Sequence, residues 1–339
     1  TIDITPDGTS LTVSSSVNAT EDIQVELGVD AALLEGYNKK YEKNYLPAPE
    51  SSYSLSSNTT VIKAGHNMSE AVDLTVNSIE EFKEGSTYCI PVTIRSTSAM
   101  KVLEASRTLF VVLKTPVISK AIYLGSNIYR VDSFKQESSL AALPQVTMEA
   151  RVYVESFASW DPYISSIMGI EGVFGVRFGD VKVSPNAVQI CHDSYQPAAE
   201  SHKFDTNKWY HVAAVWSGST FDIYIDGQYA TGVPVGGETI DLTSDNSGGF
   251  YIGASYGGGR PLYGYVAEVR VWTRALSQSE IANNMNYVDP QTEGLLAYWR
   301  MNAYEPREGG GNIVKDETGH GYDAVGGANT PKMMDTKWL

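Results

Sequence analysis

The chain has 339 residues, enough for two domains that each bury a core of their own. Charged residues make up only 19%, whereas Gly (30 residues) and Tyr (21 residues) are numerous, so the composition favours β-structure with many turns. The formal charge of −15 argues against nucleic acid and anionic membranes as partners, and no apolar run reaches the length of about 18 residues that would span a bilayer.

The two cysteines and the first residue indicate in which cellular compartment the protein is found. Cys89 and Cys191 lie far apart, in different predicted domains, so we expect two buried thiols rather than a disulfide or a thiolate metal site. The chain begins at Thr1, in a polar segment. We therefore expect that a signal peptide was removed and that the protein is exported.

The first third of the chain predicts a small antiparallel sandwich, because strand-like runs separated by turns recur about every ten residues. The predicted strands are Leu11–Val17, Ile23–Val29, Thr59–Lys63, Ala71–Val76, Tyr88–Ser96 and Ser106–Lys114. Between the second and third of them, Ala31 to Tyr45 predicts a short, solvated helix with Asp30 as its N-cap. Thr115-Pro116 marks the end of this domain, because Pro ends the preceding strand.

In the rest of the chain the clearest element is a hairpin from Trp209 to Gly227. Its second arm alternates apolar and polar residues from Phe221 to Asp226, as a half-buried strand does. The turn at 217–220 predicts a register that pairs Trp216 with Phe221, Ala214 with Ile223 and Val212 with Ile225. A slip by one residue would expose side chains whose burial is worth about 1.5–3 kcal/mol each, so the register is strongly fixed.

Further strands are predicted along the same region. They are Val146–Glu155, Ser165–Ile170, Val173–Phe178, Ala187–Ile190, Gly249–Gly253, Tyr265–Trp272 and Leu295–Met301. In the first of them the apolar residues alternate with a polar face that carries Glu149 and Arg151, which we expect to be solvated. Ser277 to Glu280 forms a capping box that predicts a short helix.

The order of four motifs in this region resembles a known family. VTMEARVYV, KWYHVAAVWSGSTFDIYIDGQ, GGFYIGAS and YGYVAEVRVWTRALSQSEI follow one another as in the laminin-G and pentraxin-like branch of the concanavalin A-like lectin/glucanase sandwiches. GLLAYWRMN and VKDETGHGYDA, within 294–324, also resemble this family, where such a segment commonly opens the domain. A rearranged strand order would close the same sandwich.

The first third resembles a second family. The stretches YSL (53–55), TTVIKAG (59–65) and YCIPV (88–92) are similar to an immunoglobulin-like domain of unknown function, found at the N-terminus of surface lipoproteins of glycan-foraging Gram-negative bacteria. Together the resemblances imply an all-β chain, with an immunoglobulin-like sandwich at 1–118 and a concanavalin A-like jelly roll at 119–339. They also imply the cell surface or periplasm, with a lipid anchor upstream of the given chain.

A sandwich glucanase would need two carboxylates in one cleft, about 5–9 Å apart. No Glu-x-Asp-x-x-Glu pattern is present; Glu149 and Glu155 read as solvated surface, and Asp226 reads as part of an Asp-Gly turn. His211 lies opposite Asp226 in the predicted register, but its place after a Trp belongs to the fold signature. We therefore favour a protein that is not an enzyme, with a glycoside hydrolase as the alternative.

Calcium is the one cofactor that the resemblance implies, since several relatives bind it through oxygen ligands. The matching positions are Glu268 and Asp316. Relatives often carry an acidic pair where this chain has Ala267-Glu268, so one carboxylate is missing. The alternative for Asp316 is a capped turn over Asp316 to Gly319.

Sugar binding requires aromatic faces together with planar polar groups in loops. Three stretches supply such residues: Trp160, Asp161 and Tyr163; His192, Asp193 and Tyr195; and Tyr256 and Arg260. His192 and His202 with Asp193 could also ligate a metal, although their spacing defines no geometry. We predict non-catalytic binding of a polysaccharide or host glycan, with a glycoside hydrolase and a structural or protein-interaction module as the alternatives.

Overall fold

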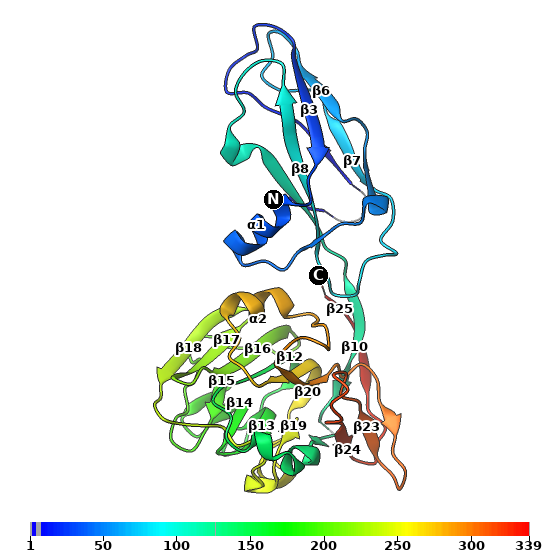
Figure 1. The fold of residues 1–339 in the computed structure, drawn as a ribbon. Coiled ribbons are helices and arrows are strands. Elements are labelled where there is room, and N and C mark those ends of the chain that lie inside the picture. The colour runs from blue at the N-terminus through cyan, green and yellow to red at the C-terminus, as the bar shows by residue number, and fades with distance from the viewer. Residues whose placement is uncertain (1, 5–7, 126, 339) are drawn as a thin grey trace. The chain divides into compact units, whose positions relative to one another are not determined.

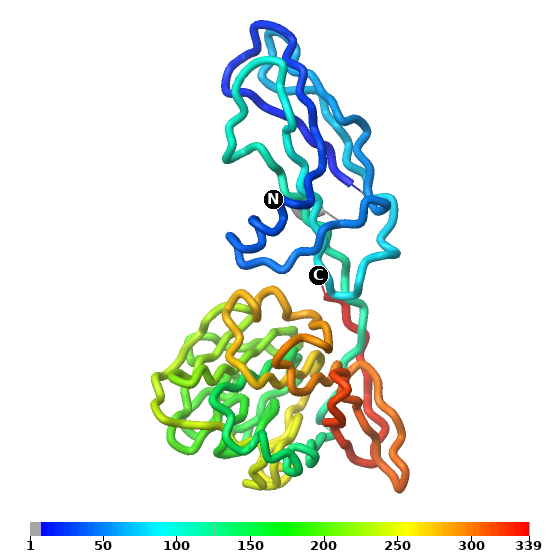
Figure 2. The backbone as a smooth tube through the Cα atoms, viewed as in Figure 1, coloured from blue at the N-terminus to red at the C-terminus, as the bar shows by residue number. Residues whose placement is uncertain are grey.

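The computed structural model describes residues 2–4, 8–125 and 127–338 and divides the chain into two compact units, one ending at Val117 and the other running from Ile118 to Trp338. Strands dominate both units (Figure 1), so the predicted all-β class is confirmed. Figure 2 follows the path of the backbone from the N-terminus to the C-terminus. In the described part of the chain no helix is long and apolar enough to cross a bilayer.

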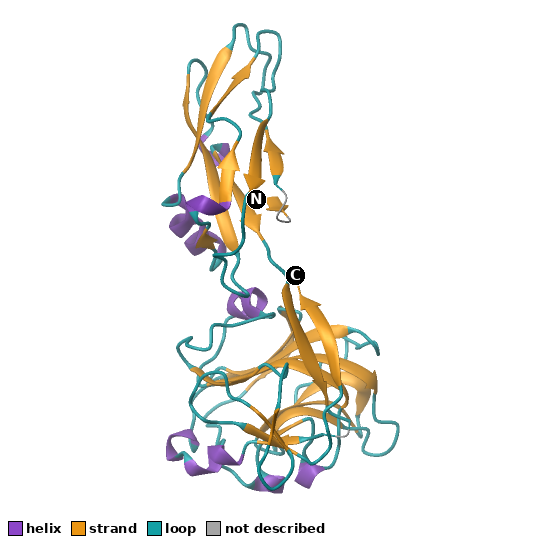
Figure 3. Cartoon of the chain, turned by 90° about the vertical axis from the view of Figure 1, so that its right-hand side faces the viewer, coloured by secondary structure: helices purple, strands orange, loops and turns teal. Residues whose placement is uncertain are grey.

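Unit 1 is a sandwich whose strands lie in two layers (Figure 3). One sheet has the order β1-β9-β8-β3-β6, with β4 paired to β8, and the other has the order β2-β7-β5. Their bounds are β1 Ile2–Ile4, β2 Thr9–Leu11, β3 Ile23–Val29, β4 Leu46–Pro47, β5 Tyr53–Leu55, β6 Thr59–Ile62, β7 Val72–Val76, β8 Tyr88–Thr97 and β9 Thr108–Leu113. Unit 1 also has helix α1 (Leu33–Tyr41) and the 3₁₀ turns η1 (Glu50–Ser52) and η2 (Glu104–Ser106).

Two details of unit 1 differ from the prediction. The N-cap of α1 is Ala32; Asp30 instead accepts the Ala32 N–H within the preceding turn, 3.1 Å away. Strand β2 ends at Leu11 instead of continuing to Val17; farther along, the Ser15 hydroxyl donates to the Val17 carbonyl and accepts the Val17 N–H.

Unit 2 consists of two eight-stranded sheets packed on one core. The first, here the β12 sheet, has the order β18-β17-β16-β12-β20-β10-β25 with β21 beside β20; the second, the β13 sheet, has the order β15-β14-β13-β19-β11-β24-β23-β22.

The bounds of the strands in unit 2 are as follows. They are β10 Val117–Tyr123, β11 Tyr129–Arg130, β12 Val146–Ser156, β13 Ser165–Ile170, β14 Phe174–Asp180, β15 Val183–Cys191, β16 Trp209–Trp216, β17 Thr220–Ile225, β18 Gln228–Pro234, β19 Tyr251–Ile252, β20 Tyr263–Trp272, β21 Leu295–Trp299, β22 Glu305–Pro306, β23 Asn312–Val314, β24 Ala324–Gly326 and β25 Met333–Trp338. The helix α2 spans Gln278–Asn284, and the 3₁₀ turns are η3 Asp132–Gln136, η4 Ser138–Leu140, η5 Asn246–Gly248 and η6 Tyr256–Gly258.

The predicted hairpin is confirmed as β16 and β17, with the register that pairs Trp216 with Phe221. One face of β16 enters the core between the sheets. The other face is also buried, because Ala213 and Val215 pack with Trp272 of β20 and Ile281 of α2. The first arm of the hairpin therefore has two buried faces, whereas the second arm has one, as its alternation predicts.

The segment 294–324 completes the sandwich, as predicted. Strand β21 pairs with β20, and β24 pairs with β11. The last strand, β25, lies beside the first, β10, and the Tyr123 N–H donates to the Lys332 carbonyl over 2.9 Å. The two ends of this unit are therefore neighbours in one sheet, which allows a rearranged strand order to give the same fold.

The helix α2 begins with the predicted capping box. The Ser277 hydroxyl accepts the Glu280 N–H, and the Glu280 carboxylate accepts the Ser277 N–H over 2.8 Å. Both cysteines are free and buried, and burial raises the pKa of Cys89 to about 12 and that of Cys191 to about 11.

Candidate functional site

Three of the four family motifs meet in a buried polar network on the α2 side of the β12 sheet. Glu149 lies on β12, His211 on β16 and Arg270 on β20, and none of these side chains is exposed. Arg270 donates to the Glu149 carboxylate over 2.9 Å, as does the indole N–H of Trp272. The expectation that Glu149 lies on a solvated face is therefore wrong, because α2 and the loop after it cover this face.

Arg151, predicted to share that solvated face, is also largely buried. Its guanidinium lies over the Trp338 ring, 4.4 Å from the ring centroid, and it donates to Asn286. Both corrections have one cause: the polar row of an amphipathic strand faces water only when no second layer covers it, and the strand sequence does not contain that information.

Burial alone would raise the pKa of Glu149, but the Arg270 charge and the His211 ring lower it to about 2. Burial lowers the pKa of His211, against the pull of Glu149, which is 3.2 Å from its Nε2 atom. The network therefore pairs a carboxylate with a guanidinium beside a neutral imidazole. Glu149, His211 and Arg270 have no exposed surface that a substrate could contact, so we interpret the network as part of the structural core.

His211 and Asp226 are neighbours, as the predicted register requires, but their contact involves the backbone. The Asp226 carboxylate accepts the His211 N–H over 2.7 Å, and Asp226 has a φ of 48° in the turn before Gly227. The interpretation of Asp226 as turn chemistry is confirmed.

The two residues expected to bind calcium lie at opposite ends of Tyr298. The Glu268 carboxylate accepts the Tyr298 hydroxyl and lies 3.4 Å from the guanidinium groups of Arg270 and Arg300. The Asp316 carboxylate accepts the Tyr298 N–H over 3.0 Å.

Asp316 also accepts the N–H and the hydroxyl of Thr318, which is the capped turn predicted as the alternative. Within the described ranges, no three His, Cys, Asp or Glu side chains gather where they could hold a metal ion. The arrangement of Glu268 and Asp316 does not fit a shared calcium site, and calcium stays a prediction that titration would test.

Of the predicted sugar residues, Tyr256 and Arg260 make the best-defined contact. Both lie on the turn between β19 and β20, where Tyr256 is 63% exposed and the Arg260 guanidinium lies 4.7 Å from its ring centroid. Arg260 donates to the Glu171 carboxylate over 2.6 Å. The exposed ring of Tyr256 thus packs against the Arg260 guanidinium, which the Glu171 carboxylate holds in place.

Glu171 is the centre of a larger polar cluster on the β13 sheet. It follows β13, and the same carboxylate oxygen that accepts from Arg260 also accepts from Arg177 of β14, over 2.8 Å. Arg177 in turn donates to Asp180 and to Gln189. Burial would raise the pKa of Glu171, but the two arginines lower it below its usual value, so the carboxylate stays ionised.

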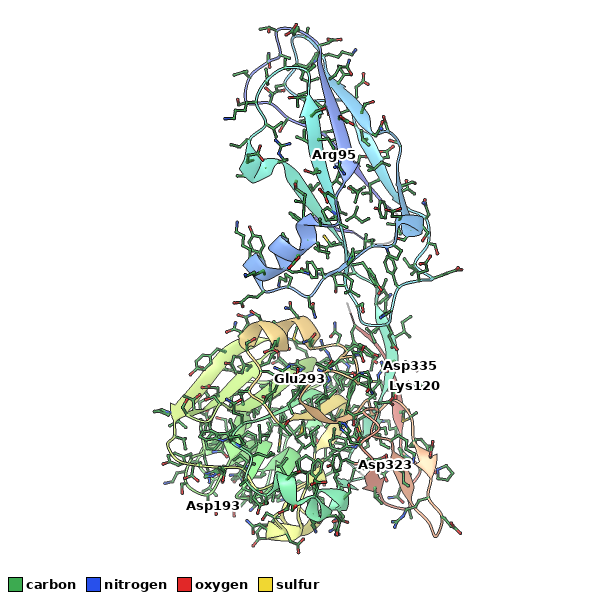
Figure 4. All side chains as sticks on the ribbon, viewed as in Figure 1. Arg95, Lys120, Asp193, Glu293, Asp323 and Asp335 are labelled. Atoms are coloured by element: carbon green, nitrogen blue, oxygen red, sulfur yellow. The ribbon has the colours of Figure 1, made fainter. Side chains whose placement is uncertain are left out.

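Asp193 reaches the same place from the end of β15. Its N–H donates to the carbonyl of Gly172, next to Glu171, and the Asn246 amide donates to the Glu171 carbonyl over 2.7 Å. The structure therefore brings Asp193, Tyr256 and Arg260 around the turn at 171–172 (Figure 4 labels Asp193). We call Asp193, Tyr256, Arg260, Glu171 and Asn246 the Glu171 surface.

His192 and Tyr195, from the same loop as Asp193, face the core instead. Their rings lie 5.0 Å and 6.3 Å from the ring of Phe221, and His192 is only 9% exposed. Burial lowers the pKa of His192. His202 contacts Ser201. His192 and Tyr195 thus support the loop, and Asp193 is its exposed member.

Trp160, Asp161 and Tyr163 occupy a separate exposed loop before β13. Trp160 is 56% exposed and meets Tyr263 edge to face at 6.2 Å. A cis peptide bond joins Asp161 to Pro162, and the Tyr163 N–H donates to the Trp160 carbonyl. Among the described residues, no hydrogen bond or ring contact joins this loop to the Glu171 surface.

A hollow of about 560 Å³ in unit 2 lies elsewhere, near the turn between β23 and β24. Leu140, Leu143 and Leu296 form part of its floor, and His320 and Tyr322 stand beside them. None of the eight residues predicted to bind sugar lines this hollow. The crevice at Glu171 is much smaller, about 10 Å³, so a ligand there would lie on the surface.

Sequence reasoning did not identify Glu171, Arg177 or Asn246. Glu171 and Arg260 are 89 positions apart, and Glu171 sits in a Glu-Gly turn that resembles any other strand connection. Only the pairing of β13 with β14 and β19 brings these positions together.

Comparison with known proteins gives two family matches. Residues 132–282 match the family described as the concanavalin A-like lectin/glucanases superfamily, and residues 1–101 match a family described as an N-terminal domain. No protein with a curated description matches the sequence.

Several solved structures are similar. A Bacteroides ovatus protein described as a "putative carbohydrate binding protein" is 26% identical, with a TM-score of 0.65, over 98% of this chain and 95% of that chain. A pentraxin from Limulus polyphemus is 15% identical, with a TM-score of 0.39, over 62% of this chain and 95% of that chain. The CBM40 of a Ruminococcus gnavus sialidase is 15% identical, with a TM-score of 0.37, over 49% of this chain and 96% of that chain.

The first of these matches extends over both units, and the family match falls on the sheets that carry the Glu171 surface. The predicted resemblance to the concanavalin A-like lectin/glucanase superfamily is therefore confirmed as a match over residues 132–282.

Proposed function

We propose that the protein binds a carbohydrate without cleaving it, and that the Glu171 surface makes the contact. The observation that carries the proposal is the exposed ring of Tyr256, supported by an arginine that Glu171 anchors. An aromatic face beside fixed donors and carboxylates is what a sugar requires, because its ring presents C–H groups to the aromatic and hydroxyls to the polar groups.

The similarity to the Bacteroides ovatus protein supports the same class of ligand, since it covers nearly the whole of both chains. We further propose that the protein is exported and works at the cell surface, which cell fractionation with an antibody would test. Detection in the cytoplasm alone would contradict this.

The test of function is a glycan array followed by calorimetry of the full chain. We expect saturable binding of at least one glycan and no release of reducing ends. A Tyr256→Ala variant should weaken that binding about fivefold to tenfold, as loss of an aromatic contact of about 1 kcal/mol would do.

Tyr229→Ala is the matched control, because Tyr229 of β18 is also exposed, at 53%, and lies outside the Glu171 surface. It should keep the wild-type affinity. Absence of binding to any glycan would contradict the function. Binding that Tyr256→Ala leaves intact and Tyr322→Ala removes would move the contact to the hollow near β23.

A further inference from the structure

Unit 1 contains two adjoining cavities that the carbohydrate proposal does not use. Their volumes are about 420 Å³ and 160 Å³, and they share Val13, Ser14, Ile94 and Ser106 in their linings. The larger alone falls in the range of about 300–1,000 Å³ that is usual for small-molecule sites. Because the linings overlap, the two cavities adjoin each other along these four residues.

The cavities lie where a strand of each sheet stops short of its neighbours. Strand β8 continues to Thr97, whereas its partner β9 begins only at Thr108. On the other sheet β2 stops at Leu11. The buried residues of unit 1 accordingly form separate apolar clusters, one around Ile90 and one around Val25.

The floor of the larger cavity is aliphatic. Ile23 and Val25 of β3 line it together with Ile62 of β6 and Ile94 of β8, and the first three are at most 3% exposed. At its mouth, Met100 is 44% exposed and Leu103 is 70% exposed. Large apolar side chains at the rim of an apolar cavity extend the surface available to an apolar ligand.

The charges of the lining all have one sign. Lys101 lines the larger cavity and Arg107 the smaller, and no Asp or Glu occurs among the described residues that line either. The Glu104 carboxylate, which lies outside both linings, accepts two hydrogen bonds from Arg107, so Lys101 is the cation that a ligand would meet. The serine hydroxyls at 14–16 and 106 add hydrogen-bonding groups to the lining. The polar end of a ligand here would therefore be an anion.

We propose that unit 1 binds one linear acyl chain with an anionic head group. The tail lies along Ile23, Val25, Ile62 and Ile94, and the head lies beside Lys101. The aliphatic floor of the larger cavity suits an unbranched chain, and the Lys101 charge favours a carboxylate over a neutral alcohol.

Calorimetry of the full chain with decanoate, below its micelle concentration, tests the proposal. We expect one saturable site, at least tenfold weaker binding of 1-decanol, and none of acetate, which has the head without the tail. Lys101→Glu should weaken decanoate about tenfold. Lys39→Glu on α1 makes the same charge change outside the lining and should leave binding unchanged.

Filling the cavity gives a second, independent readout. Ala99, which lines the larger cavity, is changed to Trp, and the fold of the variant is checked by circular dichroism. The folded variant should not bind decanoate but should bind glycans as the wild type does. Should it not fold, Lys101→Glu carries the test.

Three results would overturn the proposal: no saturable decanoate binding, equal affinity for decanoate and 1-decanol, or binding unchanged by both variants. A concentration-dependent dimer that Ala99→Trp abolishes would overturn it in favour of a second copy of the chain.

Discussion

Glu149 has no solvent contact, yet it remains ionised because Arg270, His211 and Trp272 surround its carboxylate. Such a group stabilises the fold only while its partners are present. Removing one charge leaves the other buried without a counterion, which costs about 3–5 kcal/mol, far more than the loss of an exposed ion pair.

We therefore expect Glu149→Gln to lower the free energy of unfolding by about 3–5 kcal/mol, because the buried Arg270 loses its nearest counter-charge and keeps the more distant Glu268, at 3.4 Å. Urea denaturation would measure this. Glu155→Gln is the matched control: it lies on the same strand, pairs with Lys332 at 3.5 Å on the surface, and should cost about 0–1 kcal/mol. Equal effects of the two variants would contradict the interpretation.

The same network predicts loss of stability in acid. The pKa of His211 is 6.5 in the unfolded chain and lower in the folded protein, because burial disfavours the charged ring. Between these two pKa values the unfolded chain binds more protons, so stability is complete above about pH 6.5 and is lost as the pH falls.

Glu149 acts in the same sense at lower pH. Its folded pKa of about 2 lies below the ordinary 4.5, so its contribution is present above pH 4.5 and is lost as the pH falls toward 2. Urea midpoints from about pH 8 to about pH 5 should fall in the wild type and fall less in His211→Gln. If the urea midpoints of the two proteins fell equally with pH, protonation of His211 would not contribute to the loss of stability.

At the scale of elements, the β17–β18 turn fixes where α2 packs. Gly227 has a φ of 73°, and a Cβ there would meet Ala282 of α2 at 2.8 Å. The turn therefore requires glycine twice, for its backbone conformation and for the close approach of the helix.

Gly227→Ala should consequently lower the thermal midpoint more than Gly237→Ala. Gly237 has a similar φ of 77°, but a Cβ there meets nothing within 4 Å, so its cost is the backbone strain alone, about 1–2 kcal/mol. The difference between the variants measures the contact with α2. Equal midpoints would mean that α2 moves aside without cost.

At the scale of the whole molecule, the buried apolar clusters are each confined to one unit. The largest runs from Ile122 to Ala324 in unit 2, and those around Ile90 and Val25 lie in unit 1. Cores that share no residue can unfold separately.

We expect scanning calorimetry of the full chain to resolve two transitions. Glu149→Gln should shift only the transition of unit 2, and Val25→Ala, which opens a cavity in unit 1, should shift only the other. A single transition that both variants shift would show that the units unfold as one.

The sequence by itself determined the all-β class, the hairpin register and the capping box, because each depends on residues that are neighbours in the chain or across one short turn. It also placed Tyr256, Arg260 and Asp193 in loops. Local patterns of alternation and turn chemistry are sufficient for predictions of this kind.

Only the tertiary structure decided which polar side chains are buried and which loops contact each other. Glu149 is buried because α2, more than a hundred residues later, covers its face, and Glu171 joins Arg260 across 89 positions. The open side of unit 1 likewise depends on where β2 and β9 stop relative to β8. Alternation along a strand predicts that the two faces of the strand differ, but what covers each face depends on distant parts of the chain.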